Sequence, residues 1–131
     1  MKNSLYSDIV IKTQELIAIS KPDLIGDKDF RTKFEAKMKK QDELMDELKV
    51  LAKAQKTLLG RTMQFPMADS FALYVITAVN KTTVELSWLN WCDAWVDDRL
   101  GYRGTVSLKY AEQSVYGRDR IEERFANKVK A

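Results

Sequence analysis

A run of residues at heptad spacing, between Phe34 and Leu59, most limits how this chain can fold. Its members alternate steps of four and three residues, the pattern of a helix with one apolar seam. The seam consists of Phe34, Met38, Gln41, Met45, Leu48, Ala52, Gln55 and Leu59. A second stripe of leucines beside it, at 44, 51 and 58, widens the apolar face. We therefore predict one long helix over residues 28–59, with Gly60 as its left-handed C-terminal cap.

Such a helix would be about 48 Å long at about 1.5 Å per residue, which exceeds the expected diameter of a compact chain of this size. Part of it should then project or pair with a second chain. The candidate oligomerisation residues are Phe34, Met38, Gln41, Met45, Leu48 and Gln55, and the two glutamines among them would set the register. The alternative is a helix bent or broken near Gln41 and Asp42 that folds back on its own domain. The sequence leaves both open.

The flanking segments predict two further kinds of structure. Residues 4–19 place apolar side chains on one side at helical spacing, which predicts an amphipathic helix. After Gly60 the composition changes to β-branched and aromatic residues, which predicts a short strand over 61–65 closed by Pro66 and a hairpin of 71–79 with 82–89. The first hairpin strand is apolar on both faces and should be central, whereas the second has one polar face and should lie nearer an edge.

The C-terminal quarter predicts a loop followed by short helices. Gly101 and Gly104 bracket an expected exposed turn, Ser107 can cap a helix over 108–113, and Gly117 precedes a last helix. The expected fold class is thus α+β: an N-terminal helical hairpin with one long helix, a small antiparallel sheet of about three strands, and short C-terminal helices. We expect a single domain over 1–131, with a helical part over 1–60 and the hairpin and C-terminal helices over 61–131.

Composition excludes several classes of function. The chain of 131 residues has no histidine and one cysteine, Cys92, which rules out Ser-His, Cys-His and thiolate-cluster sites. No glycine-rich phosphate loop occurs, and the spacing of Asp93, Asp97 and Asp98 matches no calcium loop. We expect no enzyme activity, no cofactor and no metal.

The cysteine count, the lack of long apolar segments and the charge balance predict where the protein is located and which partners are disfavoured. A single cysteine, no secretory apolar segment at the N-terminus and no apolar run of about 20 residues predict a cytoplasmic protein that does not enter membranes. The 22 basic and 19 acidic residues give a net charge of +3 and are balanced in both halves of the chain, which argues against general nucleic-acid affinity.

All three tryptophans fall within eight residues and are followed at once by charged residues and a tyrosine. Trp, Tyr and Arg are the side chains most enriched at binding hot spots. The candidate binding residues are Trp88, Trp91, Trp95, Asp97, Asp98, Arg99, Tyr102 and Arg103. They predict a module that binds a protein partner, acting as an adaptor, inhibitor or regulatory subunit. The alternative is that Trp88 and Trp91 close the sheet as core residues, with Trp95 and Tyr102 exposed.

A second function from another class is nucleic-acid binding by the β region. Aromatic residues would stack on bases and arginines would contact phosphates: Tyr74, Trp88, Trp95 and Tyr102 with Arg61, Arg99, Arg103, Arg118 and Arg120. Binding of that kind weakens steeply with salt, whereas an aromatic protein interface does not. The stretches 65–69 and 95–99 resemble small bacterial or phage proteins, a resemblance that implies no activity, fold or site.

Overall fold

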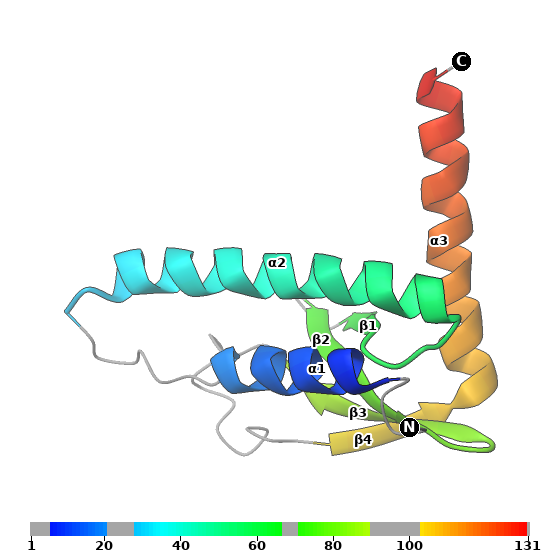
Figure 1. The fold of residues 1–131 in the computed structure, drawn as a ribbon, viewed down its shortest axis with the longest axis horizontal. Helices are drawn as coiled ribbons and strands as arrows, with labels where there is room; N and C mark the ends of the chain where they lie inside the picture. Colours follow the sequence, from blue (N-terminus) through cyan, green and yellow to red (C-terminus); the bar gives the residue numbers. More distant parts are fainter. Residues whose placement is uncertain (1–5, 21–27, 67–70, 90–102, 131) are drawn as a thin grey trace.

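Three helices and a four-stranded antiparallel sheet make up residues 6–20, 28–66, 71–89 and 103–130, the part of the chain that the computed structural model describes (Figure 1). In chain order the elements are α1 (Ser7–Ile19), α2 (Phe30–Gln55), β1 (Thr62–Pro66), β2 (Phe71–Val79), β3 (Thr83–Trp88), β4 (Arg103–Ser107) and α3 (Leu108–Lys130). The strands form a meander in the order β1-β2-β3-β4. The expected α+β fold class is confirmed.

Helices α1 and α2 run antiparallel over one face of the sheet (Figure 1). The apolar spacing of both helices explains this packing, because Ile9 and Leu16 of α1 meet Leu44 and Leu48 of α2 above Leu73 and Val75 of β2. Helix α2 has 26 residues and is not interrupted at Gln41 or Asp42, so at about 1.5 Å per residue it is about 39 Å long. The helix therefore folds onto its own domain without a break.

The end of α2 lies earlier than the predicted cap. Lys56 adopts the left-handed conformation, with φ of 54°, and its N–H donates to the carbonyls of Ala52 and Lys53. The prediction of Gly60 as the helix cap is therefore wrong. Gly60 also has a positive φ, of 80°, but it lies in the following turn and donates its N–H to the Ile76 carbonyl at 3.0 Å. A Cβ at this position would lie 2.9 Å from Leu48 Cδ2, so close packing under the helices also requires a glycine here.

Both faces of the central strands are covered. Strand β2 has Val75 on the face beneath α1 and α2, and Ile76 on the opposite face, where it packs with Met63, Val84 and α3 residues. This confirms the prediction of a central strand covered twice. The expectation that the second hairpin strand lies near an edge with a wet face is wrong, because β3 lies between β2 and β4 and Ser87, on its polar face, is only 6% exposed. Ser87 lies beside α1, where it borders a hollow with Val10, Thr13 and Ile17.

Arg103 and Gly104, the second half of the turn expected over residues 101–104, belong to strand β4 instead, and Gly101 and Tyr102 lie outside the described residues. Arg103 and Gly104 pair with Ser87 and Leu86, and Val106 pairs with Val84. The sheet therefore has four strands rather than about three in the described residues. Gly104 is tolerated within β4 because β3 pairs with it and places the large Leu86 side chain opposite it.

One helix follows β4 instead of the two short helices that were expected. The prediction of Ser107 as a cap is confirmed, since its Oγ accepts the Tyr110 N–H at 3.1 Å. Gly117 does not end the helix: α3 continues to Lys130, because burial of Ala111 and Val115 against the sheet outweighs the cost of about 1 kcal/mol for a helical glycine. The first half of α3 covers the second face of the sheet, and the second half rises past α2 to the C-terminus (Figure 1).

Candidate functional site

The predicted tryptophan site is described only at its two ends. Trp91, Trp95, Asp97, Asp98, Arg99 and Tyr102 lie outside the described residues. Trp88 is the last residue of β3, is half-buried, and pairs with Tyr74 of β2. Arg103 is the first residue of β4 and pairs with Ser87. The chain therefore leaves the sheet beside Trp88 and re-enters it at Arg103.

The meander places several chain connections at this one end of the sheet. Strand β1 ends at Pro66 where β2 begins at Phe71, and β3 ends at Trp88 where β4 begins at Arg103. In an antiparallel meander these four points lie at the same end of the sheet. Binding residues are found disproportionately on segments that a rigid sheet positions in this way. This end of the sheet is therefore the candidate site.

An aromatic cluster lies at this end, on the face that α3 covers. The Phe65 ring meets the Tyr74 ring edge to face, with centroids 5.5 Å apart and an interplanar angle of 80°. On its other side Phe65 stacks on Tyr110 of α3 at 6.1 Å and 23°. Both geometries are favourable for aromatic pairs. The cluster therefore holds Phe65 between the sheet and the first turn of α3.

A hollow of about 190 Å³ opens beside this cluster. All four strands contribute to its walls, which consist of Phe65, Tyr74, Leu86, Gly104, Thr105 and Val106. We call it the sheet-end groove. Gly104 lies opposite Leu86 in the register and adds no side chain, which leaves space over β3 and β4. Among the described residues, no carboxylate or basic side chain lines the groove, so the chemistry of this lining is that of apolar and aromatic contact.

Sequence reasoning found only part of this groove. It placed Trp88 in a binding site and proposed Tyr74 as a stacking surface, and the register brings these two residues together as direct partners. It missed Phe65, Tyr110 and Val106. The alternation of Val84, Leu86 and Trp88 was a usable signal for the face that they share, but nothing in the sequence indicates that Tyr110 reaches across to Phe65.

Two arginines that were predicted to contact phosphates make hydrogen bonds within the protein. Arg61 donates two hydrogen bonds to the Asp119 carboxylate, at 2.9 and 2.6 Å, and the two side chains are only 3% and 9% exposed. The Arg61 hydrogen bonds hold the pKa of Asp119 below its ordinary value, against the opposing effect of burial. Arg118 donates to the Thr62 carbonyl at 2.7 Å. These contacts connect α3 to the start of β1.

The candidate oligomerisation residues on the α2 seam face the chain's own core to different degrees. Gln41 and Leu48 are buried, while Phe34, Met38, Met45 and Gln55 are half-buried. The Gln41 Nε2 donates to the Ser20 Oγ at 3.0 Å and to the Leu89 carbonyl at 3.4 Å. Gln41 thereby joins the end of α1 to the exit of β3, a role that the heptad pattern does not indicate.

The described ranges contain neither a metal-binding cluster nor a membrane-spanning helix. No three His, Cys, Asp or Glu side chains there gather closely enough to hold a metal ion. No helix in those ranges combines the length and the apolar character that crossing a membrane requires. Comparison with known proteins found no matching family model, no similar curated protein and no similar solved structure.

Proposed function

We propose that this protein is a non-enzymatic binding module that seats an apolar or aromatic side chain of a protein partner in the sheet-end groove. The observation that carries the proposal is the groove itself, a hollow of about 190 Å³ walled by Phe65, Tyr74, Leu86 and Val106 beside the two points where the tryptophan-rich segment joins the sheet. Protein interfaces concentrate their affinity in aromatic or apolar anchors that fill such hollows.

The size and lining of the groove favour a protein partner over a small molecule. Pockets for small ligands and cofactors usually enclose about 300–1,000 Å³ and contain a few convergent polar groups. The groove encloses about 190 Å³ and its walls are apolar, aromatic or hydroxyl-bearing. One or two inserted side chains fit this space better than a cofactor does. The same lining supports a role in recognition rather than catalysis.

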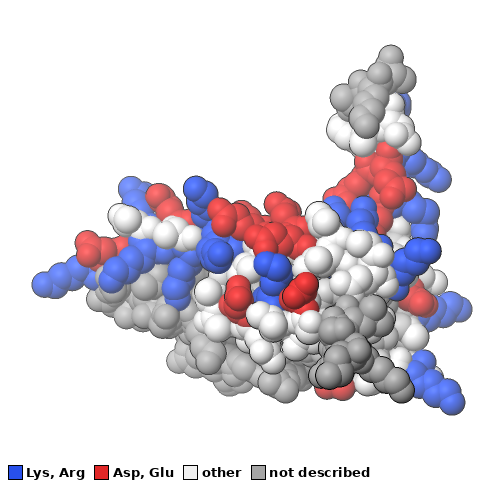
Figure 2. Space-filling model, in the orientation of Figure 1, with Lys and Arg blue, Asp and Glu red and all other residues white. Residues whose placement is uncertain are grey.

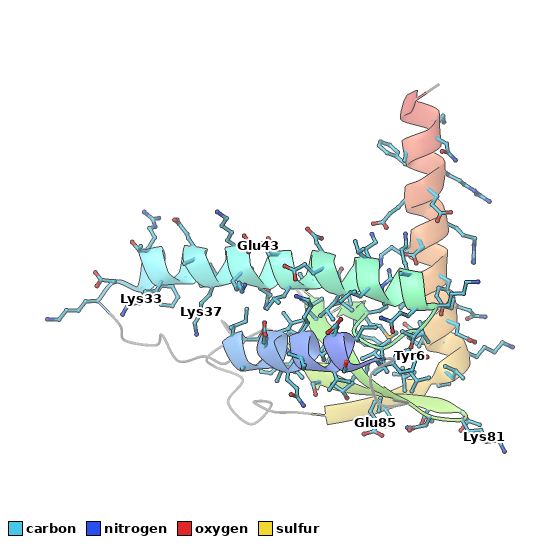
Figure 3. All side chains as sticks on the ribbon, in the orientation of Figure 1. Tyr6, Lys33, Lys37, Glu43, Lys81 and Glu85 are labelled. Carbon is cyan, nitrogen blue, oxygen red and sulfur yellow. The ribbon has the colours of Figure 1, made fainter. Side chains whose placement is uncertain are left out.

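Charge supports a protein partner over nucleic acid at this surface. Arg61 and Arg118, two of the arginines proposed for phosphate contacts, make their hydrogen bonds within the protein. One observation favours nucleic acid as a second candidate. The first part of α2 is basic, with Arg31, Lys33, Lys37, Lys39 and Lys40 against the single acidic Glu35. Figure 2 shows this basic end on the left, and Figure 3 shows Lys33 and Lys37 on the same side of the helix.

The test is an affinity capture from lysate at low and moderate salt, with and without nuclease, using the full chain and a variant that fills the groove. Gly104→Val adds a side chain on the Leu86 face, whereas Gln64→Val changes an exposed strand residue on the opposite face and is the matched control. We expect a protein that is retained at moderate salt by the wild type and the control but lost with Gly104→Val. Trp95→Ala and Arg103→Ala should also lose it, with little change in thermal stability.

Two results would contradict the proposal. Retention of the same protein by Gly104→Val would mean that the groove is not its docking site. Recovery of nucleic acid alone, released by nuclease and by rising salt, would favour the second candidate. As part of the same proposal we place the protein in the cytoplasm, because its one cysteine suits a reducing compartment.

A further inference from the structure

Strand β4 forms an open edge of the sheet. It is the last strand in the order β1-β2-β3-β4, and within the described residues it pairs with β3 alone. Figure 1 shows β4 at the lower border of the fold, with no labelled helix or strand beyond it. Thr105 and Ser107 of this strand are exposed. An open edge presents backbone N–H and C=O groups that a further strand can pair with.

The register determines which backbone groups of β4 face outward. The Leu108 N–H donates to the Thr82 carbonyl at 2.9 Å, in register with the ladder between β3 and β4. Hydrogen-bonded pairs alternate with non-hydrogen-bonded pairs along an antiparallel ladder, so Val106 and Gly104 exchange hydrogen bonds with β3. Thr105 lies between them. Its N–H and C=O therefore point away from β3, toward the open edge.

The opposite edge of the sheet, at β1, is less able to pair. The Thr62 carbonyl already accepts a hydrogen bond from Arg118 of α3 at 2.7 Å, and Pro66 at the end of the strand has no N–H to donate. Covering side chains, prolines and bulges are devices that keep a sheet edge from pairing with another chain. Strand β4 contains no proline and pairs with β3 without a bulge. Of the two edges, β4 is therefore the one available to a further strand.

The sheet-end groove lies against this same edge. Gly104, Thr105 and Val106 of β4 form one of its walls. Val106 packs on the α3 side of the sheet, and Gly104 shares that side because side chains alternate along a strand. In a strand paired antiparallel to β4, the residue opposite Gly104 belongs to a non-hydrogen-bonded pair, in which the Cα atoms are only about 4.5 Å apart. Its side chain therefore lies over the glycine and enters the groove.

We propose that the partner protein adds an extended segment to β4 as a further antiparallel strand of the sheet. This inference rests on the proposed function, because the side chain seated in the sheet-end groove belongs to that segment. The residue opposite Thr105 exchanges two backbone hydrogen bonds with it. The residue opposite Gly104 is aromatic and fills the space beside Phe65 and Tyr74, and the residue opposite Val106 is apolar. The recognised pattern, in chain order, is an apolar, a polar and an aromatic residue.

The open edge favours an extended segment over a helix or a loop. In binding by strand addition, main-chain hydrogen bonds supply affinity and pockets for alternate side chains supply specificity. Strand β4 offers both at one place, the outward backbone groups of Thr105 and the groove beside Gly104. A side chain from a helix can fill the groove, but a helix has no free backbone groups along its length to pair with β4.

The probe is a synthetic peptide of sequence Glu-Thr-Val-Thr-Phe-Thr-Glu, acetylated and amidated, titrated into the isotope-labelled full chain and followed by nuclear magnetic resonance. We expect shifts of the β4 amide resonances, with the central threonine of the peptide opposite Thr105. Methylation of the central threonine nitrogen removes an N–H that pairs with Thr105 and should raise the dissociation constant at least about tenfold. Methylation of the phenylalanine nitrogen is the matched control. Its N–H points away from β4, so the dissociation constant should change less than about twofold.

Two results of the titration overturn the added strand. One is no binding of the unmodified peptide at millimolar concentration. The other is an equal effect of the two methylations, which would mean that the phenylalanine enters the groove without backbone pairing. Neither comparison alters the protein, so neither depends on a variant that folds.

A variant of the chain separates this inference from the proposed function. Thr105→Pro removes the outward N–H, a change that an edge strand tolerates, and Thr105→Val is the matched control that keeps it. Circular dichroism checks that both are folded. In the lysate capture, a protein lost with Gly104→Val but retained by Thr105→Pro would keep the groove as its docking site and overturn the added strand. Retention by both variants would overturn the proposed function as well.

A second copy of the chain is the competing occupant of this edge. Sedimentation velocity of the chain alone tests it, and we expect a monomer whether or not Thr105 is replaced. A wild-type dimer that Thr105→Pro converts to a monomer would place β4 of a second copy on the edge and overturn the proposal.

Discussion

Replacement of Asp119 by alanine should destabilise this protein more than its position near the end of α3 suggests. Asp119 receives both hydrogen bonds of the Arg61 guanidinium, and the two side chains are 9% and 3% exposed. Removing the carboxylate leaves a buried cation without its partner. Unlike the loss of a surface ion pair, which costs at most about 1 kcal/mol, loss of one partner of a buried pair costs about 3–5 kcal/mol.

This cost should be visible as a large shift in thermal stability. At roughly 4 °C per kcal/mol for a chain of this size, Asp119→Ala should lower the Tm by about 12–20 °C. The double variant Arg61→Met with Asp119→Leu replaces both charges with apolar side chains of similar volume, and such exchanges are often neutral or stabilising. The double variant should therefore be more stable than Asp119→Ala.

The assay is a double-mutant cycle in urea, with Arg61→Met and Asp119→Leu made singly and together and unfolding followed by far-ultraviolet circular dichroism. The expected result is a coupling of several kcal/mol between the two positions. A free energy of unfolding for Asp119→Ala within about 1 kcal/mol of wild type would refute the reasoning, because Arg61 would then be solvated. The reasoning would also be refuted if the changes in unfolding free energy of the two single variants simply added up in the double variant.

The same pair predicts a dependence on pH. The pKa of Asp119 is lowered in the folded protein, chiefly by the hydrogen bonds from Arg61. A lowered folded-state pKa means that this stabilisation is complete above the unfolded-state value near 3.8 and is lost as the pH falls through the folded-state value. Below about pH 4 the urea midpoint of the wild type should therefore fall more steeply than that of the double variant.

Two further predictions concern packing. Gly60→Ala should lower the free energy of unfolding by about 2–4 kcal/mol, because the alanine must adopt a positive φ and its Cβ would lie 2.9 Å from Leu48 Cδ2. Gly117→Ala should raise the free energy of unfolding by about 0.5–1 kcal/mol, because this position is in the middle of α3 and the nearest atom to the added Cβ is 3.9 Å away. Equal effects of the two alanines would contradict this explanation. Leu48→Ala and Leu73→Ala, which open cavities in the core beneath α1 and α2, should each cost about 2–5 kcal/mol in urea unfolding, and a loss below 1 kcal/mol would place them outside the core.

The candidate site followed from the sequence only where a local pattern determined it. The alternation of Val84, Leu86 and Trp88 indicated that they share a face, and the clustering of tryptophans directed attention to the end of β3. The sheet-end groove also needs Phe65 from β1 and Val106 from β4. These residues are far apart along the chain, and only strand pairing brings them to one place.

The sequence alone determined the features that depend on neighbours within a few residues. Heptad spacing determined α2, the doubly apolar pattern determined that β2 is central, and Ser107 determined where α3 begins, because periodicity and capping act locally. Tertiary structure decided what those elements touch. It turned the α2 seam, including Gln41, toward the chain's own core, and it joined Arg61 to Asp119 across 58 residues. Burial and pairing between distant segments determine such contacts, and the local spacing of residues does not indicate which distant segment they will contact.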